Sequence, residues 1–229
     1  MTKDKTNQLK QIQERIKRAC HNVNRAHNSV TLIGASKRQT HELIAQFAEH
    51  GLSDIGENYL QEAVEKQQQL TAVKLNWHFI GQVQSNKTKT IAENFTWVHG
   101  IDRLKIAKRI DQQNPDVDRK INLLIQLNPD NEDSKGGVPL TQSSELCAQI
   151  SELDNVAIRG FMMIPKARNS IDEQRRVFAL AKEQLSLTNQ RYGLSLDSLS
   201  MGMSNDLEAA IAEGSTMVRI GTALFGARD

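Results

Sequence analysis

Apolar residues recur at spacings of three and four near the start of the chain, between residues 7 and 28. This period places them on one face of a helix, so we expect an amphipathic helix there. A short β-rich run, 30–36, follows and gives way to a helical pattern that begins near Thr40. The chain therefore opens with a helix and then one strand, loop and helix. The apolar positions of the first helix are Leu9, Ile12, Ile16, Ala19, Cys20 and Val23.

The same alternation of a short apolar run and a helical pattern continues along the chain. We expect further strands at 53–56, 76–81, 97–101, 122–128, 156–164, 196–203 and 217–225. Helices are expected between them at 59–70, 86–95, 103–113, 142–153, 172–190 and 206–213. Strands that alternate with helices pair in parallel through right-handed crossovers, and eight such units close into a barrel.

A doubly wound open sheet is the rival architecture, but no GxGxxG follows the first strand to mark a dinucleotide-binding crevice. We therefore favour an α/β protein that forms a single (β/α)8 TIM-type barrel with an additional N-terminal helix. A chain of 229 residues fits one such domain, 1–229, since these barrels use about 200 to 250 residues.

Composition narrows the class of partner. The 29 basic and 27 acidic residues are mixed along the chain and give a net charge of +2, which is no footprint for DNA, RNA or a membrane surface. The two cysteines, Cys20 and Cys147, form no CxxC pair, so we expect neither a metal site nor a disulfide. The first residues lack the apolar core of a signal peptide, and no stretch has the length of a membrane span. We expect a cytoplasmic protein, and a small anionic ligand stays open.

The loops after strands seven and eight often hold phosphate in barrels of this type. Strand seven ends in a Gly-Met-Ser204 turn, and Asn205 and Glu208 have the spacing of a capping box before an apolar run. Backbone N–H groups and the positive end of a helix dipole would converge there. Strand eight adds Gly221, which permits close backbone approach, and the hydroxyl of Thr222. Alone, the Gly-Met-Ser204 segment is typical of an ordinary turn, and a Gly-Thr pair in a strand can simply relieve steric crowding. Together, at the ends of strands seven and eight, they favour a phosphate site.

Lys37 stands where strand one ends, at the mouth of the expected barrel. Partial burial and nearby cations lower the pKa of a lysine and increase the neutral fraction that can form a Schiff base. The alternative is a solvated pair with Arg38, since lysines are mostly exposed. Position alone favours solvation.

Several ordered motifs of this sequence resemble the pyridoxal phosphate homeostasis protein family. These proteins are single-domain barrels that bind pyridoxal 5′-phosphate (PLP) and are similar to the N-terminal domain of alanine racemase, a fold-type III PLP protein. The resemblance covers essentially the whole chain. The motifs are Gly34-Ala-Ser-Lys37, Gly56-Glu-Asn-Tyr59, Trp77-His-Phe-Ile-Gly81 with Gln84-Ser-Asn-Lys87, Arg159-Gly-Phe-Met-Met-Ile-Pro165, Leu199-Ser-Met-Gly-Met-Ser204 and Met217-Val-Arg-Ile-Gly-Thr222.

The resemblance implies a role for each candidate cofactor-binding residue. Lys37 would carry PLP as a Schiff base, Asn58 would lie near the cofactor, and Arg219 would face the pyridine nitrogen. Ser204, Gly221 and Thr222 would surround the phosphate. Family members often have Ala-Val-Ser-Lys where this chain has Gly-Ala-Ser-Lys, and Ser-Lys-Ser-Gly where it has Ser134-Lys-Gly-Gly137. The first change leaves the lysine intact, and the second affects a loop of uncertain role.

Other residues offer weaker candidates. His78 and His99 could act as acid and base, although a lone histidine near a strand is more often structural. Lys87 and Lys89 could attract a second anion, but a solvated helix start explains them as well. Lys135, between serine and glycines, could help PLP to enter or leave.

Arg219 discriminates among PLP chemistries, because an arginine stays protonated and only donates hydrogen bonds. It favours an unprotonated pyridine nitrogen and so weakens the ring as an electron sink. The chain ends four residues after Phe225, which leaves no room for the second domain that supplies an opposing tyrosine in alanine racemase. We expect no catalytic residues and a monomeric PLP-binding protein of intracellular vitamin B6 and amino-acid homeostasis, with apo-PLP enzymes as candidate recipients. The alternative is a slow PLP-dependent amino-acid racemase; an RNA-binding scaffold has almost no support.

Overall fold

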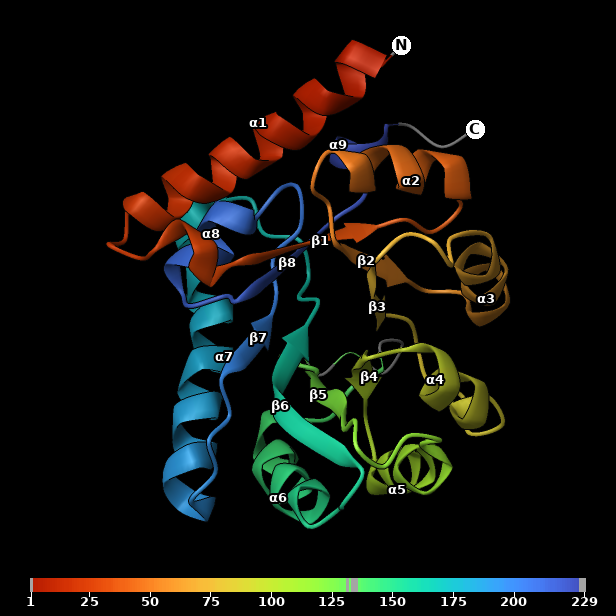
Figure 1. Cartoon of the computed structure of the whole chain (residues 1–229). Coiled ribbons are helices and arrows are strands. Elements are labelled where there is room, and N and C mark those ends of the chain that lie inside the picture. Colours follow the sequence, from red (N-terminus) through yellow and green to blue (C-terminus); the bar gives the residue numbers. More distant parts are fainter. Residues whose placement is uncertain (1, 131, 133–135, 227–229) are drawn as a thin grey trace.

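The computed structural model describes residues 2–130, 132 and 136–226, and within them the chain forms a closed barrel of eight parallel strands (Figure 1). Strand order follows chain order, and β1 pairs with β8 to close the sheet. The expected (β/α)8 TIM-type barrel is therefore confirmed. The strands are β1 Thr31–Ala35, β2 Asp54–Glu57, β3 Asn76–Phe79, β4 Trp97–Ile101, β5 Ile121–Leu127, β6 Val156–Met163, β7 Ser198–Ser200 and β8 Met217–Ile220.

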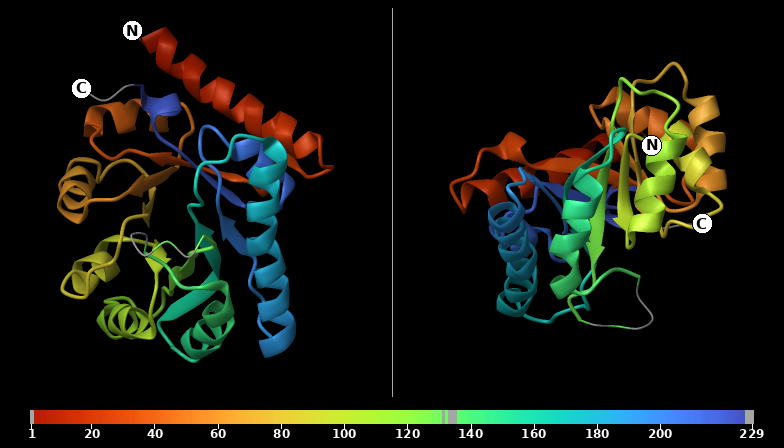
Figure 2. Two further views of the ribbon diagram at one scale, coloured as in Figure 1. Left: turned by 180° about the vertical axis from the view of Figure 1, so that it is seen from behind. Right: turned by 90° about the horizontal axis from the view of Figure 1, so that it is seen from below.

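Helices follow the strands and surround the barrel, as both views of Figure 2 show. The longest, α7, illustrates how the sequence sets their bounds. Ser170 and Glu173 form a reciprocal capping box at its start, and Gly193, at φ 64°, ends it in the left-handed conformation. The helices are α2 His41–Glu49, α3 Leu60–Gln69, α4 Thr88–Asn94, α5 Leu104–Gln113, α6 Leu140–Ser151, α7 Ile171–Tyr192, α8 Leu207–Ala212 and α9 Thr222–Phe225.

The additional N-terminal helix is present as α1, Thr2–His21, and it lies across the outside of the barrel against α8 and α9 (Figure 1). Its apolar face is buried as its periodicity predicts. The expected end at residue 28 was wrong, because Asn24 adopts a left-handed turn at φ 55° and a short 3-10 helix, η1 His27–Ser29, leads into β1.

The last two strands are shorter than the sequence predicts. We expected β8 to run to residue 225, but it ends at Ile220, because Gly221 turns the backbone and the next four residues form α9. We expected β7 at 196–203, whereas only three residues pair, and Gly202 at φ 96° bends the chain away. The early ends place a turn after β7 and the start of α9 after β8 at the mouth of the barrel.

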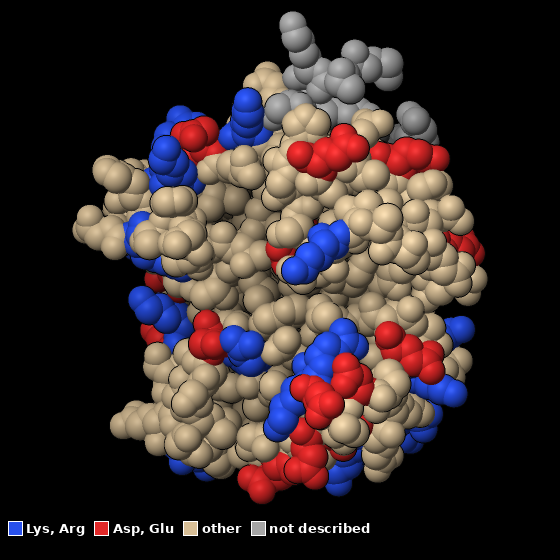
Figure 3. Space-filling view, in the orientation of Figure 1, with Lys and Arg blue, Asp and Glu red and all other residues tan. Residues whose placement is uncertain are grey.

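Most of the apolar core lies between the strands and the surrounding helices. The barrel interior holds a small apolar cluster of Ile33, Leu124, Met162 and Met217 beside buried polar side chains. On the face shown in Figure 3, lysines and arginines lie among aspartates and glutamates. Among the helices of the described ranges, none has both the length and the apolar character needed to cross a bilayer.

Candidate functional site

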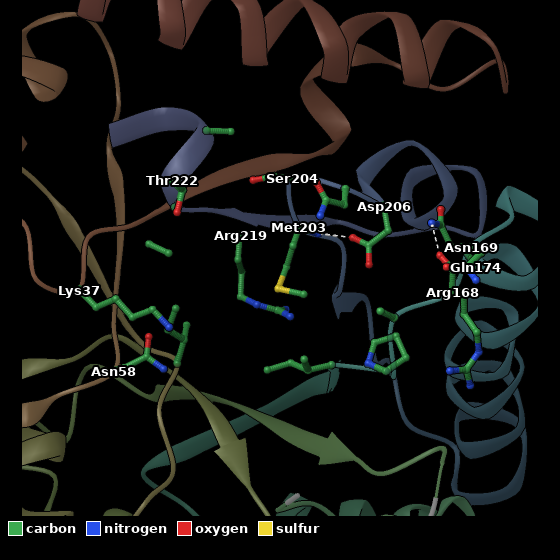
Figure 4. Close-up of a pocket in the computed structure, with 18 residues that line it drawn as sticks. Lys37, Asn58, Arg168, Asn169, Gln174, Met203, Ser204, Asp206, Arg219 and Thr222 are labelled. Carbon is green, nitrogen blue, oxygen red and sulfur yellow. Dashed lines mark hydrogen bonds between the residues drawn. The ribbon is translucent and has the colours of Figure 1, made fainter. Parts of the chain in front are cut away.

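A cavity of about 890 Å³ lies at the carboxyl ends of the strands (Figure 4). Its walls come from the ends of β1, β2, β7 and β8 and from the segment between β6 and α7. The barrel brings together residues that are far apart in sequence, as expected at this face. All six residues expected to bind the cofactor line this cavity: Lys37, Asn58, Ser204, Arg219, Gly221 and Thr222.

Lys37 lies two residues beyond the end of β1 and is half-buried, whereas the adjacent Arg38 is exposed. In Figure 4 the Lys37 side chain extends into the cavity towards Asn58. The Lys37 side chain therefore lines the cavity and does not form an exposed pair with Arg38. The turn is fixed just after it: Arg38 has φ 61°, a left-handed conformation uncommon outside glycine, and its backbone N–H donates to the carboxylate of Glu62.

Asn58 follows β2 and contributes a carbonyl oxygen to the same region. Its Oδ1 atom is buried and has no hydrogen-bond partner within the described residues. A buried amide oxygen without a partner is costly, so a ligand that donates a hydrogen bond would stabilise it. Gly81 permits this arrangement, since a Cβ at that position would lie 2.3 Å from the backbone oxygen of Asn58.

A buried ion pair supports the Lys37 turn from behind, and the sequence analysis missed it. Glu57 is fully buried, and its Oε1 lies 2.6 Å from Lys66 Nζ and 2.5 Å from Ser36 Oγ. Burial raises the pKa of the Glu57 carboxyl, although hydrogen bonds from Lys66 oppose that shift. Lys66 also donates to Glu62 at 2.6 Å. The signal was available: Lys66 follows the buried Ala63 by three residues, so it lies on the inner face of α3.

Arg219 is the central cation of the cavity. It is 5% exposed, and its Nη1 donates to the carbonyl and hydroxyl oxygens of Ser200 at 2.6 and 2.7 Å, while Nη2 donates to Met163 O at 3.0 Å. Burial lowers the pKa of Arg219 to about 10, partly offset by Asp206. The guanidinium therefore stays protonated at neutral pH. Three of its five N–H bonds point to these acceptors, which leaves Nε–H and one Nη2–H.

The turn after β7 and the first residues of α9 form an anion cradle beside Arg219. Within the described residues, the backbone N–H groups of Ser204 and Asn205, and of Thr222 and Ala223, have no acceptor, and the two hydroxyls add further donors. Gly221 lies beside β1, and a Cβ added there would be in ordinary van der Waals contact with Ala35 O, at 3.4 Å, so space alone does not require glycine at this position. Such a set of N–H and O–H groups suits a phosphate.

The capping box predicted for Asn205 and Glu208 was wrong. The helix α8 is preceded by Asp206, whose side chain instead accepts from Met203 N at 2.6 Å. Glu208 turns outward to Arg15 of α1, at 2.9 Å from its Nε, and Arg15 Nη2 also donates to Ser204 O at 3.0 Å. Long-range contacts with α1 competed successfully for the glutamate, and they hold the loop that carries Ser204.

The remaining candidates lie away from the cavity. His78 and His99 are buried inside the barrel and do not line it. Lys87 and Lys89 are exposed, and Lys89 pairs with Glu93 at 4.0 Å. Lys135 lies outside the described residues. No group of three or more potential metal ligands occurs among the residues that the structure describes.

These groups fit PLP. An amine, a set of anion donors and a guanidinium that only donates hydrogen bonds line one cavity, and the unpartnered, buried Asn58 Oδ1 belongs to a residue of the same wall. Asp206 is the one carboxylate among the cavity-lining residues described, and burial raises its pKa despite the hydrogen bond from Met203.

Comparisons of sequence identify relatives along nearly the full chain. Residues 8–229 match the family model of the alanine racemase N-terminal domain. The chain is 46% identical over 221 residues to the pyridoxal phosphate homeostasis protein of Pseudomonas aeruginosa, covering 96% of this chain and 94% of that protein. It is 43% identical over 229 residues to the protein of that name from Escherichia coli K12, covering 99% and 97%.

Solved structures agree with these relationships. PipY of Synechococcus elongatus PCC7942, solved with PLP bound, has a TM-score of 0.80 and 36% identity, covering 86% of this chain and 93% of PipY. Alanine racemase of Clostridium difficile 630 has a TM-score of 0.65 at 14% identity, covering 91% of this chain and 55% of the racemase. That second likeness shows the fold alone.

Proposed function

The chain belongs to the pyridoxal phosphate homeostasis protein family, and we propose that it binds PLP as a Schiff base on Lys37. We further propose that it acts in intracellular PLP, or vitamin B6, and amino-acid homeostasis without efficient catalysis. Its relatives from P. aeruginosa and E. coli carry that role in their names, and PipY binds PLP.

One observation carries the proposal: Lys37 and Arg219 line the same cavity from the adjacent strands β1 and β8. A half-buried amine on one side and a buried, donor-only cation on the other match the aldehyde and the ring nitrogen of PLP. PLP, when bound, supplies an electrophilic aldehyde and an electron-accepting ring.

The other residues bind and orient the cofactor. Ser204, Gly221 and Thr222 hold the phosphate through backbone N–H groups and two hydroxyls, and Asn58 accepts a hydrogen bond with its buried carbonyl oxygen. Arg219 donates to the ring nitrogen and keeps it unprotonated, which limits the stabilisation of a substrate carbanion. That choice of partner supports binding without efficient turnover.

Asp206 is the observation that favours the second candidate, a slow PLP-dependent racemase. Its carboxylate lines the cavity, and burial raises its pKa towards the range of a general base. However, Oδ1 accepts from Met203 N–H at 2.6 Å, and Arg219 interacts with the same carboxylate. We therefore propose that Asp206 orders the loop before α8 rather than moving a proton.

The wider setting is also part of the proposal. We propose that residues 1–229 act as one PLP-binding domain, as a monomer in the cytoplasm, and that apo-PLP enzymes are the recipients of the cofactor. The continuous barrel and the coverage of the relatives support the first point.

The decisive experiment locates the covalent bond. The protein is purified without added cofactor, loaded with PLP, reduced with borohydride and digested for peptide mass spectrometry. We expect one stoichiometric adduct, on Lys37, which Lys37→Ala abolishes while thermal unfolding of the apoprotein stays cooperative. Lys89→Ala, at an exposed position of α4, is the matched control and keeps the adduct. A stoichiometric adduct on any other lysine of the wild type would contradict the assignment.

A further inference from the structure

A continuous series of hydrogen bonds crosses the barrel interior from Arg219 to Asp54. Arg219 Nη1 donates to Ser200 Oγ at 2.7 Å, and that oxygen lies 2.9 Å from His99 Nδ1. His99 Nε2 lies 3.1 Å from His78 Nδ1, and His78 Nε2 lies 3.0 Å from Asp54 Oδ1. We call these five residues the barrel network.

The barrel network joins two separate cavities. Arg219 lines the cofactor cavity, whereas Asp54 is the first residue of β2 and lines a cavity of about 540 Å³ beside α1 and β1. The two histidines and Ser200 are each at most 1% exposed, and the Asp54 side chain is 15% exposed. The middle of the network is therefore shielded from solvent, and its two ends lie at the two cavities.

The two ends of the barrel network fix the direction of every bond between them. Arg219 only donates, and an ionised Asp54 only accepts. Hydrogen bonds from Ser53, Asn76 and His78 reach that carboxylate. With both imidazoles neutral, only one placement of the protons then allows all four hydrogen bonds of the network to form.

In that arrangement the proton of each imidazole is on Nε2. His78 Nε2–H donates to Asp54, and His99 Nε2–H donates to His78 Nδ1. The Ser200 hydroxyl donates to His99 Nδ1, so the lone pairs of its oxygen are directed to Arg219. An extra proton on either imidazole would force the Ser200 hydroxyl to turn away.

Aromatic contacts hold the histidine nearer to Asp54 in place. The His78 ring stacks on Trp97 with centroids 5.8 Å apart and planes at 13°. The guanidinium of Arg159 lies over the Trp97 ring, 5.3 Å from its centroid. His99 packs edge-on to His78 at 5.2 Å. The rings therefore have little freedom to lose the hydrogen bonds by rotation.

We propose that the barrel network is a positioning device: Asp54, at the other end of the barrel, fixes the Arg219 guanidinium that faces the cofactor. This inference rests on the proposed function, because it assigns Arg219 to PLP. Two of the three hydrogen bonds that hold the guanidinium go to Ser200, and the direction of its hydroxyl depends on His99 and, through His78, on Asp54. Asp54 is thus a positioning residue that never touches the cofactor.

The protonation pattern is tested in the apoprotein. Histidine labelled with ¹⁵N gives two-bond ¹H–¹⁵N spectra that identify the tautomer of each ring at pH 7.5. We expect both His78 and His99 to be neutral with the proton on Nε2. An imidazolium or an Nδ1–H form at either residue would overturn the inference.

Variants test the positioning. Asp54→Asn and Ser200→Ala should shift the Arg219 Nε–H resonance of the apoprotein, and each should weaken PLP binding by roughly threefold to tenfold, the loss expected for one hydrogen bond. Ser200→Thr keeps the hydroxyl and should restore both readouts. Ser198→Ala is the matched control, since Ser198 is buried in the same strand but bonds to Asp197.

Failure of this inference is distinguishable from failure of the proposed function. An unchanged Arg219 resonance in Asp54→Asn and Ser200→Ala would overturn the inference whether or not PLP binds. The inference would also be overturned if these two variants bound PLP as tightly as Ser198→Ala does. If the expected tautomers and resonance shifts are found but no adduct forms on Lys37, the network holds Arg219 and the proposed function fails. Should Asp54→Asn not fold, the Ser200 variants decide.

Discussion

Lys66 Nζ donates a hydrogen bond to the backbone carbonyl of Ser36, 2.8 Å away, and Ser36 immediately precedes Lys37. The Ser36 hydroxyl donates to Glu57, the buried partner of the same amine. The carbonyl and the hydroxyl of Ser36 therefore both bond to one ion pair, which helps to fix the backbone from which the Lys37 side chain starts.

Removing the Lys66 charge should destabilise the fold. Lys66→Met keeps the length of the side chain but leaves the fully buried Glu57 without its cation. We expect the free energy of unfolding to fall by about 3 to 5 kcal/mol, as is typical when one partner of a buried pair is removed. Urea denaturation of the apoprotein measures it. The exposed control Lys89→Met should change it by less than about 0.5 kcal/mol. Equal free energies of unfolding for Lys66→Met and Lys89→Met would show that the Lys66–Glu57 pair does not stabilise the fold.

The phosphate cradle is tested by deleting its hydroxyls. Ser204→Ala and Thr222→Ala should weaken PLP binding, each by about 1.5 to 3 kcal/mol at most, since each removes one hydrogen bond to a charged group. Affinities are measured by absorbance titration. Pyridoxal, which lacks the phosphate, is the control ligand, and its reaction with Lys37 should be unchanged. If the double variant binds PLP as tightly as the wild type, the phosphate lies elsewhere.

Turnover separates the proposed function from a racemase. General acid and base groups commonly contribute factors of about 10² to 10⁴ each, so a site without a free opposing base should be slow. We expect α-proton exchange of L- and D-amino acids in deuterated water to be no faster with the PLP-loaded protein than with free PLP. Fast exchange that Lys37→Ala abolishes would establish an enzyme. Loss of that exchange in Asp206→Asn, with PLP still bound, would identify the aspartate as its base.

Stability should depend on pH through His99. Burial, followed by the nearby His78 and Arg219, holds the pKa of His99 well below its ordinary 6.5. As pH falls below about 6.5, the unfolded chain takes up a proton that the folded protein does not, so the free energy of unfolding falls. The His99→Gln variant should have a lower free energy of unfolding than the wild type at pH 7.5. Between pH 7 and pH 5, however, that free energy should fall by less than it does in the wild type. Denaturation at several pH values measures both slopes, and the exposed control His21→Gln should keep the wild-type slope. Parallel curves for wild type and His99→Gln would refute the assignment.

The sequence predicts features that depend on neighbouring residues, and it misses those that depend on register. The alternation of strands and helices is local, so the barrel and the loops that carry Lys37 and Ser204 could be placed, whereas Thr222 was expected in strand eight and begins α9. The His78 and His99 rings meet because β3 and β4 pair with His78 opposite Trp97, and that register is not visible in a single sequence. Glu208 likewise pairs with Arg15 of a distant helix instead of capping its own.

Closure of the barrel by β1 and β8 has a consequence for how the protein acquires its cofactor. Lys37 follows the first strand and Thr222 follows the last, so the two halves of the site are at opposite ends of the chain in the order of synthesis. A nascent chain exposes Lys37 early, long before the pairing of Gly34 with Ile220 can form. The phosphate cradle cannot form until β8 has left the ribosome, so we expect the complete site to bind PLP only after β8 has paired with β1.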